Sequence, residues 1–149
     1  MKKIAAAVVA CTTLLAAGSV FAQAKPEQLV KQRQAALTVL AKYFGPMGAM
    51  ANGKAPYNAE IVKRNAAYVA VLAKMPWDGF AESTKDVKSK ALPAIYEDPA
   101  KFKAAAERLE TETAKLASIV ASGSEGDIKG QIKATAKTCG GCHNDFRAK

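Results

Sequence analysis

The chain has 149 residues, of which half are hydrophobic and 23% are charged, and its formal net charge is +9. This length suits one domain. The basic residues are spread along every segment, with no run of five Lys or Arg, which argues against nucleic-acid binding and favours a solvated basic surface. Attraction of acidic redox partners or anionic small molecules stays open as a functional reading of that charge.

Residues 1–22 have the pattern of a secretory signal peptide. Lys2 and Lys3 give a basic start, residues 4–17 form a short apolar core, and small residues precede a cleavage point after Ala22. The core is too short and too rich in Ala for a membrane span. We therefore expect export to the periplasm.

The mature chain is then expected to be residues 23–149, a single domain, with Ala24 as a second choice of cleavage point. Loss of the two leader lysines lowers the net charge from +9 to +7. Residues 8–11 loosely resemble a lipoprotein cleavage box, but the apolar run continues past Cys11. We interpret Cys11 as a leader residue, so the mature chain keeps two of the three Cys and has no disulfide framework.

Frequent Ala and short β-branched runs predict a helical chain. A first helix is predicted to begin at Pro26, which suits the first helical position. Arg33 lies on its apolar stripe, where a buried guanidinium needs an anionic partner that this helix does not supply. The alternative is an Arg that reaches solvent from the edge of the stripe. The apolar stripe consists of Leu29, Leu37, Leu40, Phe44 and Met47.

Gly45-Pro46 is expected to bend or interrupt this helix. A second helix is predicted from Ala59 to Lys74, with Asn58 as its N-cap and Pro76 as its stop. Its inward residues are predicted to be Ile61, Tyr68, Val69 and Leu72.

The stretch from Trp77 to Asp98 is the least regular, and a connection this long is often functional. Its aromatic residues could pack against a flat cofactor or could close the end of a helical bundle; these are Trp77, Phe80 and Tyr96.

Asp98-Pro99 predicts the capped start of a third helix. That helix carries two seven-residue series, Phe102–Leu109–Leu116 and Ala106–Thr113–Val120, as in a bundle seam. After Ser122-Gly123, Ser124 or Asp127 is expected to cap a fourth helix. Four helices with one long connection predict an all-α fold, an antiparallel four-helix bundle with left-handed packing. The stripe of the fourth helix is Ile128, Ile132, Thr135, Cys139, Cys142 and Phe146.

The last helix contains Cys139-Gly140-Gly141-Cys142-His143, the attachment motif of a c-type haem. Two thiols about one turn apart share a helical face, so both can reach one porphyrin edge, and the adjacent imidazole can ligate the iron. A dithiol redox pair normally opens a helix after a strand, and a zinc site lacks further ligands. The motif predicts one covalent haem c per chain, inside the bundle, whose propionates could pair with Arg33.

His143 is the single His, so a second imidazole cannot ligate the iron. The sixth site can be filled by Met, Lys, Tyr or a small molecule, or it can be empty. Met47, Met50 and Met75 are the Met candidates, but all three lie near predicted helix ends and loops. Leu37 occupies the interior of the first stripe, and an aliphatic side chain over the iron would leave it five-coordinate.

The chain resembles the cytochrome c′ family across essentially all of its mature length, and the position of the haem motif at the C-terminus is the most telling feature. The matching stretches are Lys-Gln-Arg-Gln-Ala-Ala-Leu (31–37), Tyr-Phe-Gly (43–45), Ala-Pro-Tyr (55–57), Met-Pro-Trp with Phe80 (75–80), Leu-Pro-x-Ile-Tyr (92–96) and Cys-x-x-Cys-His-x-x-Phe-Arg (139–147).

The resemblance implies a homodimer built mainly from the first two helices, and a high-spin five-coordinate haem c. By position it implies covalent attachment through Cys139 and Cys142, with His143 as the axial ligand. Arg33 and Gln34 would lie against the haem, and Leu37 would screen its distal face. Arg147 would lie on the proximal side. In the stretch 77–96 the family has acidic residues where this chain has Lys or Ala, which leaves Lys90 as a weak candidate for a haem contact.

The first functional hypothesis is a gas-binding haem protein for nitric oxide and carbon monoxide. The alternative is a low-spin electron carrier with Met as sixth ligand and a periplasmic redox protein as partner; the two roles can coexist. An enzyme is not expected, because no second His is available as a distal acid or base.

Overall fold

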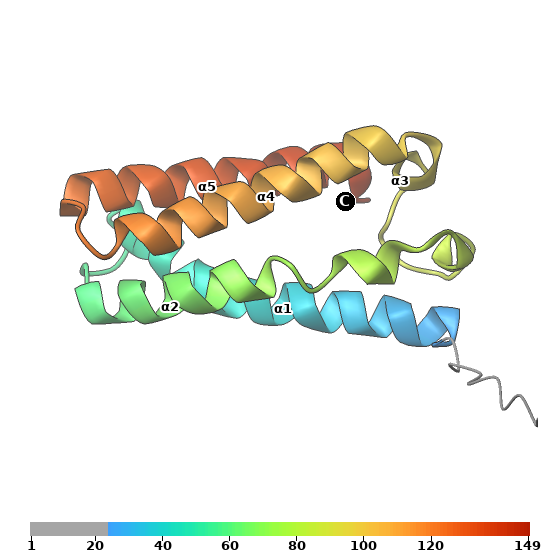
Figure 1. Cartoon of the computed structure of the whole chain (residues 1–149), viewed down its shortest axis with the longest axis horizontal. Coiled ribbons are helices and arrows are strands. Elements are labelled where there is room, and N and C mark those ends of the chain that lie inside the picture. The colour runs from blue at the N-terminus through green and yellow to red at the C-terminus, as the bar shows by residue number, and fades with distance from the viewer. Residues whose placement is uncertain (1–23) are drawn as a thin grey trace, which may run out of the picture.

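A computed structural model describes residues 24–149, so the predicted leader lies outside the described residues. Four long helices run antiparallel to their chain neighbours: α1 (Pro26–Ala51), α2 (Ala59–Leu72), α4 (Pro99–Ile119) and α5 (Glu125–Phe146) (Figure 1). The connection from α2 to α4 holds three short helices: η1 (Trp77–Phe80), η2 (Glu82–Thr84) and α3 (Ala94–Glu97). The predicted all-α four-helix bundle is confirmed.

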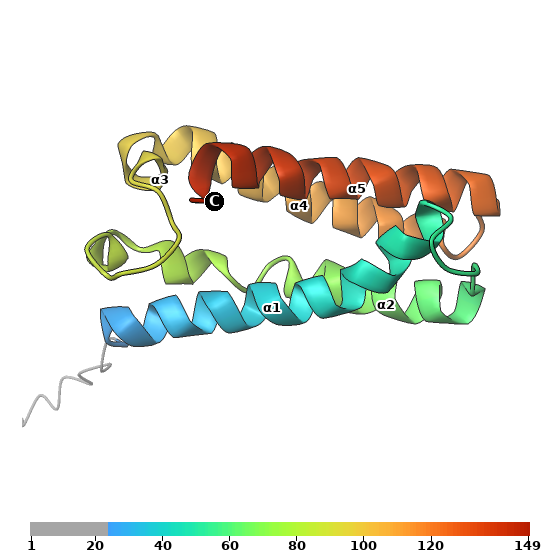
Figure 2. The same cartoon turned by 180° about the vertical axis from the view of Figure 1, so that it is seen from behind.

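Helix α1 continues through Pro46 to Ala51, which the sequence left open. Proline removes a backbone donor and crowds the preceding turn, so a carbonyl near it needs another partner. Asn65 on α2, 2% exposed, donates its Nδ2 to the Tyr43 carbonyl at 3.0 Å. The last turns of α1, teal in Figure 2, tilt away from the axis of its first turns, as expected for a proline bend.

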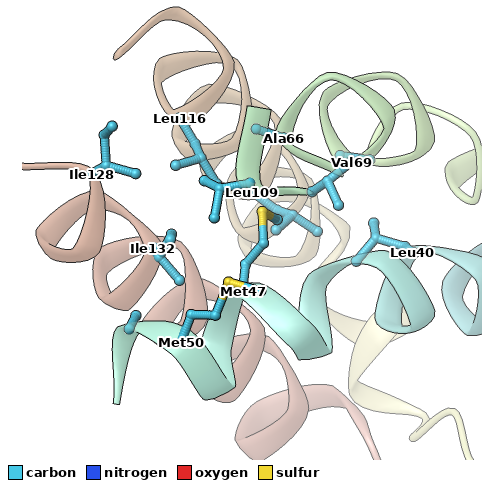
Figure 3. Packing of buried hydrophobic residues seen from close by; sticks show 12 residues of the cluster. Leu40, Met47, Met50, Ala66, Val69, Leu109, Leu116, Ile128 and Ile132 are labelled. Atoms are coloured by element: carbon cyan, nitrogen blue, oxygen red, sulfur yellow. The ribbon is translucent and has the colours of Figure 1, made fainter. Parts of the chain in front are cut away.

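The hydrophobic core fills the half of the bundle next to the α1–α2 and α4–α5 loops. Met47 is fully buried there and packs among residues of all four long helices (Figure 3). Because apolar side chains from each helix are removed from water together, this core holds the bundle closed at one end. The largest residues of this core are Leu40, Met47, Met50, Val62, Val69, Leu109, Leu116, Ile128 and Ile132.

One inward residue of α2 was predicted wrongly. Tyr68 is 45% exposed and packs its ring against Tyr43 with the centroids 5.0 Å apart. The buried face instead follows the spacing i, i+3, i+4, i+7 and consists of Val62, Asn65, Ala66 and Val69. The polar Asn65 on this face concealed its register from a count of apolar residues. The helix also ends at Leu72, two residues before the predicted Lys74.

Side-chain caps begin three of the helices as predicted. Asn58 Oδ1 accepts from the Ile61 amide at 3.0 Å, and Asp98 Oδ1 accepts from the Lys101 amide at 2.9 Å. Ser124, rather than Asp127, caps α5. These bonds satisfy amides that have no partner within the helix and fix where each helix begins.

The chain terminus is held against the long connection. The Leu92 amide donates to the Phe146 carbonyl at 3.0 Å, and the Ala148 amide donates to the Lys90 carbonyl at 2.8 Å. Ala91 and Arg147 form an isolated antiparallel bridge between these segments. The end of α5 is thereby fixed beside residues 89–92. No helix in the stretch 24–149 is long and apolar enough to cross a membrane.

Gly79 lets the long connection lie directly on α1. A Cβ at this position would stand 2.5 Å from the Cβ of Arg33 and 2.8 Å from the Leu29 carbonyl oxygen. We expect Gly79→Ala to lower the free energy of unfolding by about 1–3 kcal/mol, because the backbone must move apart. Denaturation of both proteins in urea measures this.

Gly130→Ala is the matched control, since nothing lies within 4 Å of a Cβ there in the middle of α5. It should raise the free energy of unfolding by about 0.5–1 kcal/mol through helix propensity. Equal stability of Gly79→Ala and the wild type would contradict the close packing.

Candidate functional site

A cavity of about 600 Å³ opens between α1, α4, α5 and the long connection, beyond the hydrophobic core. This volume falls within the usual range for sites that hold a small molecule or cofactor. Its walls are mainly apolar, with polar and charged side chains at the edges. All seven residues predicted for the site line it: Arg33, Gln34, Leu37, Cys139, Cys142, His143 and Arg147.

Helix α5 brings the two thiols to the same wall of the cavity. Cys139 and Cys142 are half-buried, and both are free of disulfide bonds. Burial raises the pKa of both the Cys139 and the Cys142 thiol. Both side chains thus enter the cavity as neutral thiols, spaced to reach one edge of a flat group.

His143 follows on the next position of α5. Burial, and then the positive charge of Arg147, lower the pKa of His143. The neutral imidazole is thereby favoured, and this is the form whose ring nitrogen can bind a metal. The backbone amide of Arg147 donates to the His143 carbonyl at 3.2 Å, which continues the helical hydrogen bonding to the end of α5.

Arg33 is 3% exposed, so it does not reach solvent from the edge of its helix. Its Nη1 donates to the Gly79 carbonyl and to Thr84 Oγ1, and its Nη2 donates to Ser89 Oγ at 3.0 Å. Its guanidinium also lies 4.3 Å from the centre of the Phe80 ring. Every one of these partners is uncharged. A buried cation held in this way favours an anionic group in the adjoining cavity.

The indole N–H of Trp77, at the cavity, has no hydrogen-bond partner among the described residues. Trp77 Nε1 is buried and forms no hydrogen bond with any described residue. A buried indole N–H normally finds an acceptor, so this donor indicates a missing ligand atom. The aromatic rings around it form an apolar wall. The ring centroids of Trp77 and Phe102 lie 6.0 Å apart, and those of Phe102 and Phe146 lie 5.2 Å apart.

The residues fit a haem c. Two thiols and an imidazole lie on one wall, aromatic rings form others, and a cation and an unpaired N–H suit the two propionates. Of the three aromatic residues that the sequence left between two roles, Trp77 and Phe80 line the cavity. Tyr96 does not line it and instead forms a hydrogen bond with Thr84.

The three Met among residues 24–149 lie outside the lining of the cavity. Met47 and Met50 are buried in the hydrophobic core, and Met75 is 56% exposed. The residues that line the cavity within 24–149 include no Met. Leu37, half-buried on α1, does line it.

Sequence reasoning missed part of the wall. Leu109 and Phe146 line the cavity, yet they lie on the same apolar stripes as core residues, so periodicity could not separate the two sets. Thr84 and Ser89 support Arg33 from an irregular stretch that offered no pattern to read.

Comparison with known proteins agrees with this site. The family model described as Cytochrome C′ matches residues 28–147. A cytochrome c′ of Rubrivivax gelatinosus is 38% identical over 84% of this chain and 98% of its own, and one of Halomonas halodenitrificans is 39% identical over 85% and 100%.

Two solved structures have the same fold. Cytochrome c prime from Shewanella frigidimarina superposes with a TM-score of 0.81 at 33% identity, covering 85% of this chain and 99% of its own. A nitric oxide complex of a leucine-to-isoleucine variant of cytochrome c prime from Alcaligenes xylosoxidans superposes with a TM-score of 0.77 at 32% identity, covering 85% and 98%. With the family model and these relatives spanning nearly all described residues, the chain belongs to the cytochrome c′ family, whose members carry covalently attached haem c.

Proposed function

We propose that this chain is a periplasmic haem c protein with five-coordinate, high-spin iron that binds nitric oxide and carbon monoxide and can also transfer electrons. One observation carries the proposal. The cavity that holds Cys139, Cys142 and His143 is lined by Leu37 and by none of the three Met of the mature chain. An aliphatic side chain on the lining, with no Met beside it, supports an iron whose sixth position has no Met ligand.

Each residue has a distinct part in this function. The Cys139 and Cys142 thiols would hold the haem covalently, each adding its S–H across one vinyl group, with sulfur bonding to one carbon and the proton to its neighbour. His143 would ligate the iron through a ring nitrogen, and Arg33 and Trp77 would donate hydrogen bonds to the propionates. Haem c, when bound, supplies an iron with one face open to a small gas.

Leu37 gives the distal side its selectivity. Its aliphatic side chain offers no hydrogen bond to steady bound dioxygen, whereas nitric oxide and carbon monoxide do not require one. The solved nitric oxide complexes of the Alcaligenes xylosoxidans relatives support gas binding on this fold. Gln34 lies beside Leu37 on the lining, and Arg147 lies on the His143 side, where its charge acts on the proximal imidazole. The aliphatic Leu37 and the nitric oxide complexes of the relatives favour gas binding as the main role rather than catalysis.

Replacement of Met tests the alternative directly. Met75→Leu, Met47→Leu and Met50→Leu should each leave the ferrous absorption spectrum and the carbon monoxide affinity unchanged. Met75 is the most informative, because it is exposed and its replacement should not disturb the core. A change from low-spin to high-spin absorption in any of the three would identify that Met as a ligand and would support the electron carrier.

We also propose that residues 1–22 direct export and that two copies associate through α1 and α2. The large apolar residues that remain exposed in the described chain lie on these two helices or directly after α2; they are Val39, Tyr68, Val71 and Met75. Such side chains suit a contact between copies. The mass of the mature protein tests cleavage after Ala22, and sedimentation equilibrium tests the dimer.

A further inference from the structure

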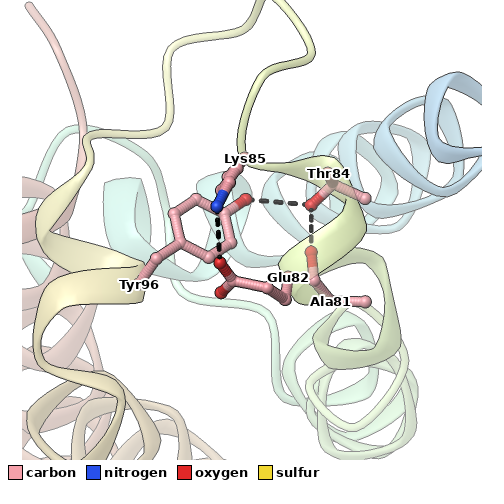
Figure 4. A network of polar contacts seen from close by, with 5 residues as sticks. All are labelled: Ala81, Glu82, Thr84, Lys85 and Tyr96. Carbon is pink, nitrogen blue, oxygen red and sulfur yellow. Dashed lines mark hydrogen bonds and ion pairs between the residues drawn. The ribbon is translucent and has the colours of Figure 1, made fainter.

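Behind the cavity, two hydroxyl groups form a chain of hydrogen bonds that ends on Arg33. Thr84 Oγ1, on η2, accepts from Arg33 Nη1 at 3.0 Å. The same oxygen lies 2.9 Å from the Tyr96 hydroxyl on α3 (Figure 4). Thr84 is 1% exposed. Neither Thr84 nor Tyr96 lines the cavity, so neither can touch a group bound in it.

Counting donors and acceptors fixes the direction of each bond. A threonine hydroxyl has one proton to donate and two lone pairs that accept. The Thr84 proton goes to carbonyl oxygens, that of Ala81 at 2.7 Å and more weakly that of Gly79 at 3.4 Å. Because carbonyls only accept, Thr84 must accept from both Arg33 and Tyr96. The Tyr96 phenol is therefore the donor. All the hydrogen-bonding capacity of Thr84 is used, which fixes its oxygen in one position.

The same count for Arg33 leaves two N–H donors without a partner among the described residues. A guanidinium has five N–H groups, and three are occupied by Gly79, Thr84 and Ser89. The other two have no partner among the described residues and remain for an anion in the cavity. Ser89 supports Nη2 in the same manner, since its oxygen also accepts from the Ala91 amide at 3.2 Å.

Neutral support has an electrostatic consequence that a carboxylate would not have. A carboxylate beside Arg33 would hold the guanidinium equally well, but it would cancel the positive charge within the site. Hydroxyl and carbonyl oxygens fix the side chain and leave the whole charge to act on the cavity. No carboxylate within residues 24–149 forms an ion pair with Arg33.

We propose that Thr84 and Tyr96 are positioning residues that hold Arg33 as an uncancelled cation against a haem propionate and thereby raise the reduction potential of the iron. The inference rests on the proposed contact between Arg33 and the propionate. A fixed positive charge beside the haem favours the ferrous state, because that state carries one positive charge fewer than the ferric state. Removing the Thr84 hydroxyl takes away one of the three hydrogen bonds that hold the guanidinium and weakens this effect.

The test is the reduction potential of the haem-loaded protein in a set of variants. Arg33→Gln should lower the potential, and Thr84→Val and Tyr96→Phe should each lower it by a smaller amount. Thr84→Ser keeps the hydroxyl and should retain the wild-type potential. In the double variant Arg33→Gln/Thr84→Val, the Thr84 substitution should add no further shift, because it acts through Arg33.

Two controls separate positioning from a general loss of stability. Thr113→Val also removes a buried threonine hydroxyl, one whose proton goes to the carbonyls of Leu109 and Glu110 on its own helix. Tyr68→Phe removes a hydroxyl from an exposed ring. Both should leave the potential unchanged, whatever they do to thermal unfolding.

Three other results for the reduction potential would each contradict one step of the inference. If Arg33→Gln lowers the potential but Thr84→Val does not, the positioning role is wrong while the propionate contact stands. If Thr84→Val still lowers the potential in the Arg33→Gln background, Thr84 acts on the fold as a whole and the inference is wrong. If Arg33→Gln has no effect, the contact itself is wrong, and the support has no function at the haem.

Discussion

Replacing both Cys139 and Cys142 by alanine is expected to abolish covalent haem attachment completely. Both thiols lie on one face of α5 and line the same cavity, so each can form one thioether with the same porphyrin edge. With neither thiol present, haem can be held only by His143 and by non-covalent contacts. Haem staining of the protein after denaturing electrophoresis measures this, and the band should disappear.

Cys11→Ala is the matched control for the Cys pair. Cys11 is the third Cys of the chain and lies within the predicted leader, so it should be absent from the mature protein. Its replacement should leave the haem-stained band at full intensity. A stained band that survives in the double Cys139→Ala/Cys142→Ala variant would show that haem is attached elsewhere, and the assignment of the motif would be wrong.

Leu37→Ala is expected to speed the binding of carbon monoxide to the ferrous protein by roughly fivefold to a hundredfold. If Leu37 covers the open face of the iron, as proposed, an incoming gas must displace or compress its side chain, and forcing extra atoms into a packed site raises the energy by about 1–3 kcal/mol. Because about 1.4 kcal/mol of barrier is tenfold in rate, removing the obstruction gives an increase of this size. Stopped-flow mixing with carbon monoxide measures it.

Val39→Ala controls for a general effect of shortening an aliphatic residue on α1. Val39 is exposed on the outer face of the helix and does not line the cavity, so its replacement should leave the rate unchanged. Leu37→Ile keeps the side-chain volume and should stay closer to the wild type than Leu37→Ala. An unchanged rate in Leu37→Ala would place Leu37 in the wall of the cavity but away from the path of the gas.

The long helices and the chemistry of α5 could be predicted from the sequence because they depend on local signals. The caps Asn58, Asp98 and Ser124 each act within one turn of their own helix. The spacing of Cys139, Cys142 and His143 is likewise a property of one helical turn. For the same reason, the predicted stripe of α5 contains four of the five buried residues of that helix, and it misses only the polar Gln131.

Features that depend on contacts between distant segments could not be predicted. The continuation of α1 past Pro46 is supported by Asn65 on another helix, 22 positions away from Tyr43. The bonds that hold the chain terminus to residues 90–92 follow no sequence pattern. Tyr68 was predicted to face inward together with Ile61, Val69 and Leu72, whereas it packs on Tyr43 at the surface.

For Arg33, burial could be predicted from the sequence, but its hydrogen-bond partners could not. Its place on an apolar stripe correctly indicated burial, and the cost of burying a lone charge indicated a need for an anion in the cavity. The partners that hold it come from residues 79–89, an irregular stretch whose position over α1 depends on tertiary packing. The close approach of Gly79 to α1 is the packing contact that makes this arrangement possible.

The absorption spectrum of the purified protein, ferric and ferrous, before and after addition of carbon monoxide, tests the central claim most directly. The claim is that Leu37, and no ligating side chain, faces the iron opposite His143. We expect a high-spin ferrous spectrum that changes on addition of the gas. A sharp low-spin spectrum that carbon monoxide leaves unaltered would contradict the claim, because it would show that a side chain of the protein already occupies the sixth position.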